Sequence, residues 1–218
     1  MLSVNLEDLV SAPRHVLCLG AHPDDLEIGC GGTVIRLMAQ ARPPAVTWVV
    51  FTADARREAE AVNSAETLLR GAARSRVIVH KFRDGFLPHE GAAVKEAFED
   101  LKAETAPDLI LTHQRGDLHQ DHRVISELTW NTFRDHTILE YEIPKYDGDM
   151  GAPNFFVTLD ETCVRRKIDA ILAGFPSQAG HRWFTEETFR SLLRLRGLEC
   201  NAPGEYAEAF YCRKLRAA

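Results

Sequence analysis

The sequence lacks the cysteine patterns of disulfide-stabilised proteins and of thiolate metal sites. Its five cysteines are odd in number and include no C-x-x-C pair, so we expect them to be reduced. The chain has no run near the roughly 18 consecutive apolar residues that a membrane-spanning helix needs. Residues 1–10 lack the basic start and the apolar run of a secretory signal. These absences predict a cytoplasmic protein with no membrane span.

The sequence also lacks a strong excess of charge of one sign. It has 26 Lys and Arg against 32 Asp and Glu, with the two signs interspersed. A nucleic-acid-binding surface is usually basic, so no nucleic acid partner is expected. With 45% hydrophobic and 27% charged residues, the composition is that of a globular protein. We predict a single domain over residues 1–218. The sequence does not decide whether the protein forms a homo-oligomer.

Apolar patterns alternate between strand and helix along the first two thirds of the chain. Continuous apolar runs indicate buried strands, and helical spacing indicates the segments between them. The predicted elements are strand 14–20, helix 33–42, strand 45–52, helix 56–70, strand 76–82, helix 93–104, strand 108–112, helix 121–133 and strand 136–141. This alternation predicts a Rossmann-like three-layer α/β sandwich with a mostly parallel sheet, of order 3-2-1-4-5.

The C-terminal portion, residues 136–218, has a looser pattern and is expected to complete the fold and the substrate pocket. Its further predicted elements are a Gly/Pro/Asp-rich loop at 144–153, a strand at 155–159, a helix at 160–173 with Asp160 as its N-cap, and a helix at 185–196. The loop lies where a lid could form. The sequence does not decide whether His181 or Trp183 contributes to the pocket.

Two polar segments, AHPDDLE at 21–27 (the first motif) and HQDH at 119–122 (the second motif), crowd imidazoles and carboxylates together. Each follows a predicted buried strand, and ligands of open parallel sheets bind at carboxyl ends where the strand order reverses. In the order 3-2-1-4-5, strands 14–20 and 108–112 are neighbours at that reversal. Buried charges without partners are costly. A divalent cation would satisfy both segments.

The spacing within the two segments separates the roles of their side chains. The proline after His22 biases that residue towards an extended backbone, so His22 and Asp25 could bind a metal while Asp24 accepts a proton. His119 and His122 share a face of a helical turn, so one could bind the metal and the other the substrate. Two imidazoles and a carboxylate are typical of catalytic zinc. They also compose the iron facial triad, so the ligands alone leave the metal open.

The sequence resembles the PIG-L/LmbE-like family of metal-dependent N-deacetylases, which includes the deacetylases of glycosylphosphatidylinositol, mycothiol and bacillithiol biosynthesis. AHPDDLEIGCGGT at 21–33 matches the family's A-H-P-D-D-E opening, with Leu26 before the acidic Glu27. HQDHR at 119–123 matches its H-x-D-H element, and the resemblance covers roughly residues 14–135. It implies an LmbE-like fold, a Zn2+ or other divalent cofactor, and hydrolysis of the acetamide of an N-acetylated amino sugar or sugar conjugate.

Carried over by position, the resemblance makes His22, Asp25 and His122 the zinc ligands and Asp24 the general base. The implied enzyme is a zinc-dependent hydrolase of a linear amide C–N bond, with a small-molecule N-acetyl sugar as its partner. The family also includes members that add water to an unsaturated dicarboxylic acid. A hydratase or lyase on the same scaffold is therefore the alternative function.

The resemblance also implies roles for residues around the proposed metal ligands. His119, as an imidazolium, would stabilise the oxyanion, and Asp121 would orient it. Arg57 and Asp84 fall where relatives contact the sugar. Some relatives place a tyrosine five residues before the last ligand, where this chain has Asp117. Any phenol hydrogen bond to the reaction intermediate is therefore absent or supplied from elsewhere.

Overall fold

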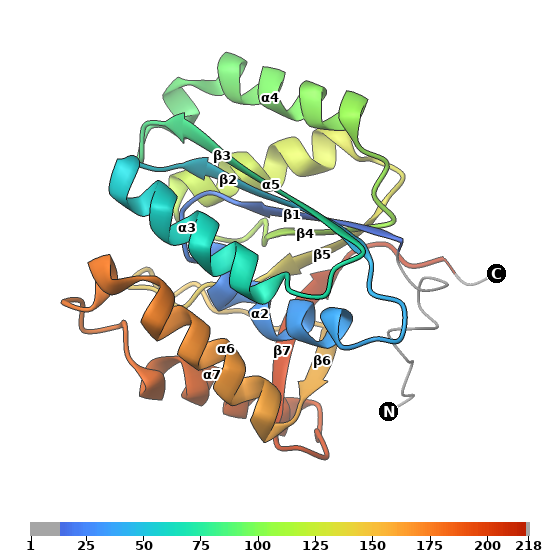
Figure 1. Cartoon of the computed structure of the whole chain (residues 1–218), viewed down its shortest axis with the longest axis vertical. Helices are drawn as coiled ribbons and strands as arrows, with labels where there is room; N and C mark the ends of the chain where they lie inside the picture. The colour runs from blue at the N-terminus through green and yellow to red at the C-terminus, as the bar shows by residue number, and fades with distance from the viewer. Residues whose placement is uncertain (1–13, 217–218) are drawn as a thin grey trace.

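The structure, a computed structural model, describes residues 14–216 (Figure 1). Residues 1–10, from which the lack of a secretory signal was inferred, lie outside this range. Strands from residues 14–135, which carry both motifs, and from the C-terminal portion join the same sheet. Within the described part of the chain, no helix is both long and apolar enough to cross a membrane. The cysteines lie within this range and are all unpaired, as predicted.

The centre of the fold is a seven-stranded sheet with the spatial order β3-β2-β1-β4-β5-β7-β6. The strands are β1 His15–Gly20, β2 Ala45–Thr52, β3 Arg74–Phe82, β4 Leu109–His113, β5 Thr137–Tyr141, β6 Phe155–Leu159 and β7 Tyr206–Cys212. The predicted order 3-2-1-4-5 is confirmed, and these five strands are parallel. The strand β7, which the sequence pattern did not predict, pairs antiparallel with both β5 and β6.

Helices cover both faces of this sheet, which confirms the predicted three-layer α/β sandwich. They are α2 Asp25–Met38, α3 Ala55–Leu68, α4 Gly91–Glu104, α5 Gln120–Thr132, α6 Glu161–Gly174 and α7 Glu186–Glu199, with the short 3-10 turns η1 Leu87–His89 and η2 Pro176–Gln178. Figure 1 shows α4 and α5 on one face and α2, α3, α6 and α7 on the other. Successive residues of β1 therefore pack into different cores, Val16 and Cys18 into one and Leu17 and Leu19 into the other.

The helix after the first motif begins at Asp25, not at residue 33 as the apolar spacing predicted. Gly29, Gly31 and Gly32, which precede the predicted start, lie inside this helix together with the fully buried Cys30. A β-carbon at Gly29 would lie 2.1 Å from the ring of Tyr141 in β5. The Tyr141 hydroxyl donates to the carbonyl of Leu19 at 2.8 Å. The absence of a side chain at Gly29 thus lets α2 approach the sheet.

A matched pair of substitutions tests this packing. Gly29→Ala should lower the free energy of unfolding by about 1–3 kcal/mol, the usual cost of overpacking. Gly31→Ala lies in the same helix, but its nearest neighbour would be 3.6 Å away, so the gain in helix propensity should leave stability unchanged or raise it by up to about 1 kcal/mol. Denaturant unfolding measures both variants. Equal effects would show that Tyr141 moves aside at no cost.

Candidate metal centre and catalytic site

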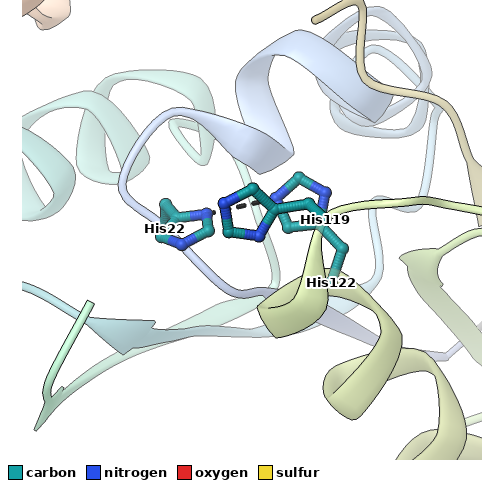
Figure 2. A group of neighbouring side chains, drawn as sticks. All are labelled: His22, His119 and His122. Atoms are coloured by element: carbon teal, nitrogen blue, oxygen red, sulfur yellow. Dashed lines mark hydrogen bonds between the residues drawn. The ribbon is translucent and has the colours of Figure 1, made fainter. Parts of the chain in front are cut away.

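The two motifs meet where β1 and β4, which pair in parallel, reach their carboxyl ends. The first motif forms the turn from β1 into α2, and the second begins α5. Figure 2 shows His22 of the first motif facing His119 and His122 of the second. All the sequence-predicted site residues except Asp121 line a cleft of about 660 Å³ at this edge.

Three side chains that line this cleft converge at short range. His22 Nδ1 lies 3.1 Å from His122 Nε2 and 3.3 Å from Asp25 Oδ2. His122 Nε2 lies 3.5 Å from Asp25 Oδ1. Two ligand atoms bound tetrahedrally to zinc at about 2.0–2.1 Å are themselves about 3.3–3.4 Å apart. The separations of the three side chains therefore suit a common small cation.

The outward-facing ring nitrogens of the two histidines are bonded to carboxylates. His22 Nε2 lies 3.2 Å from Asp121 Oδ2 and 3.1 Å from Asp84 Oδ1. His122 Nδ1 lies 2.9 Å from Asp117 Oδ2. With a metal ion bound, each outward nitrogen would carry the ring proton towards its carboxylate, and His22 Nδ1 and His122 Nε2 would offer lone pairs beside Asp25. This donor set fits a divalent cation.

The pKa values of the three side chains show that the cluster favours positive charge next to Asp25. Burial lowers the pKa of His22 and of His122, but the charge of Asp25 and hydrogen bonds to acids outweigh burial, and both pKa values are raised. Burial raises the pKa of Asp25, but the charges of His122, His113 and His22 hold it well below its ordinary value. The anion Asp25 therefore draws in positive charge, from ring protons or from a metal ion.

Within residues 14–216, three overlapping groups of side chains have ligand atoms within 4.8 Å of one another. They are His22 with His119 and His122, Asp25 with His113 and His122, and His22 with Asp84 and Asp121. His22 and His122 each occur in two groups and contact one another. The side chain of Asp84, by contrast, is 78% exposed, so it lies at the cleft surface rather than at the centre of the cluster.

Asp24 has an unusual backbone conformation at the start of α2. Its φ of 106° lies in the left-handed region, which costs a non-glycine residue about 1–3 kcal/mol and is common at functional sites. Its side chain makes no capping hydrogen bond and lies 3.2 Å from the guanidinium of Arg57. Burial raises the pKa of Asp24 to about 7, against the opposing charge of Arg57. A carboxyl group with this pKa can exchange protons near neutral pH.

Arg57 lines the cleft as a substrate-contacting residue would, yet several of its donors are already used. Its guanidinium donates to the carbonyl of Pro23 and to the hydroxyl of Ser177, the latter at 2.9 Å. Glu60 lies 3.5 Å away on the same helix. Arg57 therefore ties α3 to the turn that holds Asp24, and it fixes the direction of that carboxyl group.

His119 is the N-cap of α5 and lines the cleft. Its Nδ1 accepts the backbone N–H of Asp121 at 3.2 Å, which places the proton of a neutral ring on Nε2. Burial, and then the charges of His122 and His22, lower the pKa of His119. This direction opposes the imidazolium that the family resemblance implies. A neutral His119 keeps an N–H donor for a ligand in the cleft.

The carboxylate of Asp121 does not contact His119 as the resemblance implied. It accepts the backbone N–H of Gly85 at 2.7 Å and that of Leu87 at 3.2 Å, and it also contacts His22. Asp121 therefore orients a ring of the metal cluster and anchors the turn after β3. Only its backbone N–H reaches His119.

Several residues near the cleft were not assigned to the site from the sequence. His113, the last residue of β4, is fully buried, and its Nε2 lies 3.2 Å from Asp25 Oδ2. Burial lowers its pKa to about 4, so the ring is neutral beneath Asp25. Trp183 lines the cleft, and His181 stacks on it with ring centroids 6.0 Å apart. Lys145, from the predicted loop at 144–153, also lines the cleft.

A comparison of the sequence with models of known protein families identifies the family of this chain. Residues 17–133 match the family model PIG-L, described as GlcNAc-PI de-N-acetylase. The chain belongs to the PIG-L family. The match ends just after α5, so it spans both motifs and the strands that position them. No curated protein sequence matches the chain.

Solved structures of similar fold include N,N'-diacetylchitobiose deacetylase from Pyrococcus horikoshii, at 22% identity over 94% of this chain and 86% of that one, TM-score 0.71. GalB, the 4-carboxy-2-hydroxymuconate hydratase from Pseudomonas putida KT2440, is similar at 17% identity, over 94% and 98% of the two chains, TM-score 0.70. The zinc-inhibited form of teicoplanin deacetylase Orf2 is similar at 14% identity, over 90% and 97%, TM-score 0.69. These matches confirm the LmbE-like fold predicted for the PIG-L chain.

Proposed function

We propose that the protein is a metal-dependent N-deacetylase that hydrolyses the acetamide of an N-acetylated amino sugar or sugar conjugate. The observation that carries this proposal is the convergence of three acceptor groups, His22 Nδ1, His122 Nε2 and the Asp25 carboxylate, within 3.1–3.5 Å of one another. They lie at a cleft that also contains a candidate base, in a chain of the PIG-L family.

His22, Asp25 and His122 would hold the metal, which we propose to be zinc. When bound, a zinc ion would polarise the acetamide carbonyl and increase the acidity of water. Asp121 and Asp117 support this set, because each accepts a hydrogen bond from the outward nitrogen of a ligand histidine. Such partners fix the ring orientation of metal-binding histidines.

Asp24 would act as the general base and then as the general acid. It would take a proton from the attacking water as the water oxygen bonds to the carbonyl carbon. It would then give that proton to the amide nitrogen as the C–N bond breaks, so that acetate and a free amine leave. The raised pKa of Asp24, about 7, supports both proton transfers. The ion pair with Arg57 would hold the carboxyl group in place at the cleft.

His119 would donate a hydrogen bond from Nε2 to the oxygen that becomes negative as water adds to the acetamide carbonyl. A neutral imidazole can serve as such an electrophile, as in other enzymes that use histidine to polarise a carbonyl. Asp84 and Arg57, which both line the cleft, would contact the sugar. The free cysteines are consistent with the predicted cytoplasmic location.

The proposal predicts acetate release by the metal-loaded protein. The assay uses a panel of N-acetylated sugars, glycosides and nucleotide sugars, with one equivalent of zinc per chain, because a structurally similar deacetylase has a zinc-inhibited form. Chelator-treated protein should release no acetate and should recover on addition of metal. Fold similarity to GalB makes an unsaturated dicarboxylic acid the comparison substrate. If the protein adds water to that acid and releases no acetate from any acetamide, the deacetylase assignment is wrong and the protein is a hydratase.

A further inference from the structure

Asp117 lies between β4 and α5, and its side chain is fully buried. Its carboxylate faces donors from three directions. Oδ1 accepts the backbone N–H of His119 at 2.8 Å. Oδ2 lies 2.9 Å from His122 Nδ1 and also 2.9 Å from the Lys145 ammonium group. One buried carboxylate therefore contacts both histidines of the second motif.

The donors around Asp117 leave no place for a neutral side chain of the same shape. A carboxylate offers acceptors on both oxygens, whereas an asparagine amide has one acceptor and an NH2 group that only donates. At position 117, that NH2 group would point at a donor whichever way the amide is turned. If it faces His122, it can hydrogen-bond only to a bare Nδ1. The His122 proton would then move to Nε2, which points into the metal cluster.

The third donor, Lys145, is held in place by its own segment of the chain. Lys145 Nζ lies 2.5 Å from Asp149 Oδ2, and that oxygen accepts the N–H of Leu118 at 2.7 Å. The loop from Glu142 to Gly151 is in turn anchored by Arg196 of α7, which binds the Glu142 carboxylate at 2.9 Å and the Gly151 carbonyl at 3.1 Å. The ammonium group thus stays beside Asp117, where its charge favours the ionised carboxylate.

We propose that Asp117 is a positioning residue that fixes His122 in the tautomer with its proton on Nδ1, so that Nε2 offers a lone pair to the metal ion. The inference rests on the proposed function, because it concerns the same metal site. It does not depend on the substrate or on the reaction. A carboxylate that served only to pair with Lys145 would not need contacts to His119 and His122, and its loss would leave metal binding unchanged.

The test is the zinc affinity of Asp117→Asn, measured by competition with a chromophoric chelator in the absence of substrate. Removing the hydrogen-bond partner of a metal-binding histidine typically weakens metal affinity about 10- to 100-fold, and we expect a loss in this range. Asp54→Asn is the matched control. Asp54 lines the same cleft but caps α3 through Arg57 N–H, and asparagine caps equally well. Its zinc affinity should equal that of the wild type.

A measurement on the wild type covers the case in which Asp117→Asn fails to fold. In the zinc-loaded protein, long-range 1H–15N correlation should show His122 protonated at Nδ1 and not at Nε2. A bare Nδ1, or unchanged zinc affinity in a folded Asp117→Asn variant, would overturn the proposal. Absence of acetate release by the wild type, with the tautomer and the affinity loss as expected, would refute only the proposed deacetylase function.

Discussion

Asp24→Asn should retain its metal and lose turnover by about 10²- to 10⁴-fold, the range of a general acid–base contribution. The amide has nearly the shape of the carboxyl group, and asparagine tolerates the left-handed backbone of this position. It cannot accept and return a proton. Loss of a proton-transfer group should lower kcat and leave KM nearly unchanged. Steady-state acetate release, with metal content measured on the same samples, gives both quantities.

Asp25→Asn is the matched control, because it changes the neighbouring residue in the same way. Asp25 lies among the rings of His22, His113 and His122. Its amide variant should therefore bind metal more weakly, whereas Asp24→Asn should lose proton transfer. Added zinc should partly restore Asp25→Asn and should not restore Asp24→Asn. Near-normal kcat in Asp24→Asn would remove Asp24 from the role of base, and equal metal loss in both variants would make Asp24 a ligand.

The parallel part of the fold could be predicted because four of its five strands, β1, β2, β4 and β5, are buried on both faces. Every residue of β1 after His15 is buried, which gives a continuous apolar run in the sequence. The strand β7 escaped prediction because Glu208, its third residue, interrupts the apolar pattern. The Glu208 carboxylate accepts the backbone N–H groups of Gly32 and Thr33 at 2.7 Å and pairs with the Lys167 ammonium group at 2.6 Å. These partners are distant from Glu208 in the sequence, so no local sequence pattern could predict them.

The start of α2 escaped prediction for a related reason. Glycine is a poor helix former, and three glycines and two acids among the first eight residues of this segment favour a loop on local grounds. Tertiary contacts decide otherwise, since the glycines let the helix lie against Tyr141 and Leu159. The helix therefore begins directly after Asp24, and this places the side chains of Asp24 and Asp25 at its first turn.

The meeting of the two motifs followed from strand order, because β1 and β4 are neighbours and both motifs lie at their carboxyl ends. The choice of His122 rather than His119 as a ligand rested on the family resemblance. The hydrogen bonds of the ring nitrogens did not follow from the sequence. They depend on where individual side chains point, as for the Asp121 carboxylate, which contacts His22 instead of His119. Lys145 comes from an irregular loop, whose path no periodicity specifies.

His122→Ala should abolish tight metal binding, whereas the wild type should carry about one divalent ion per chain. Loss of His122 removes one of three converging acceptors and leaves His22 and Asp25, 3.3 Å apart, free to pair with each other. Its zinc affinity should therefore fall further than the 10- to 100-fold typical of losing a hydrogen-bond partner of a ligand. Elemental analysis and chelator competition measure stoichiometry and affinity.

Thermal unfolding gives an independent readout of the same ion. A ligand present at about 1,000 times its Kd stabilises the native state by about 4 kcal/mol, which corresponds to roughly 10 °C in Tm for a chain of this size. A chelator should therefore lower the Tm of the wild type and leave that of His122→Ala unchanged. His89→Ala, in the turn η1, is the control that should behave as the wild type. Equal metal retention by His122→Ala and the wild type would remove His122 from the ligand set, because a true ligand cannot be lost without cost to a three-residue site.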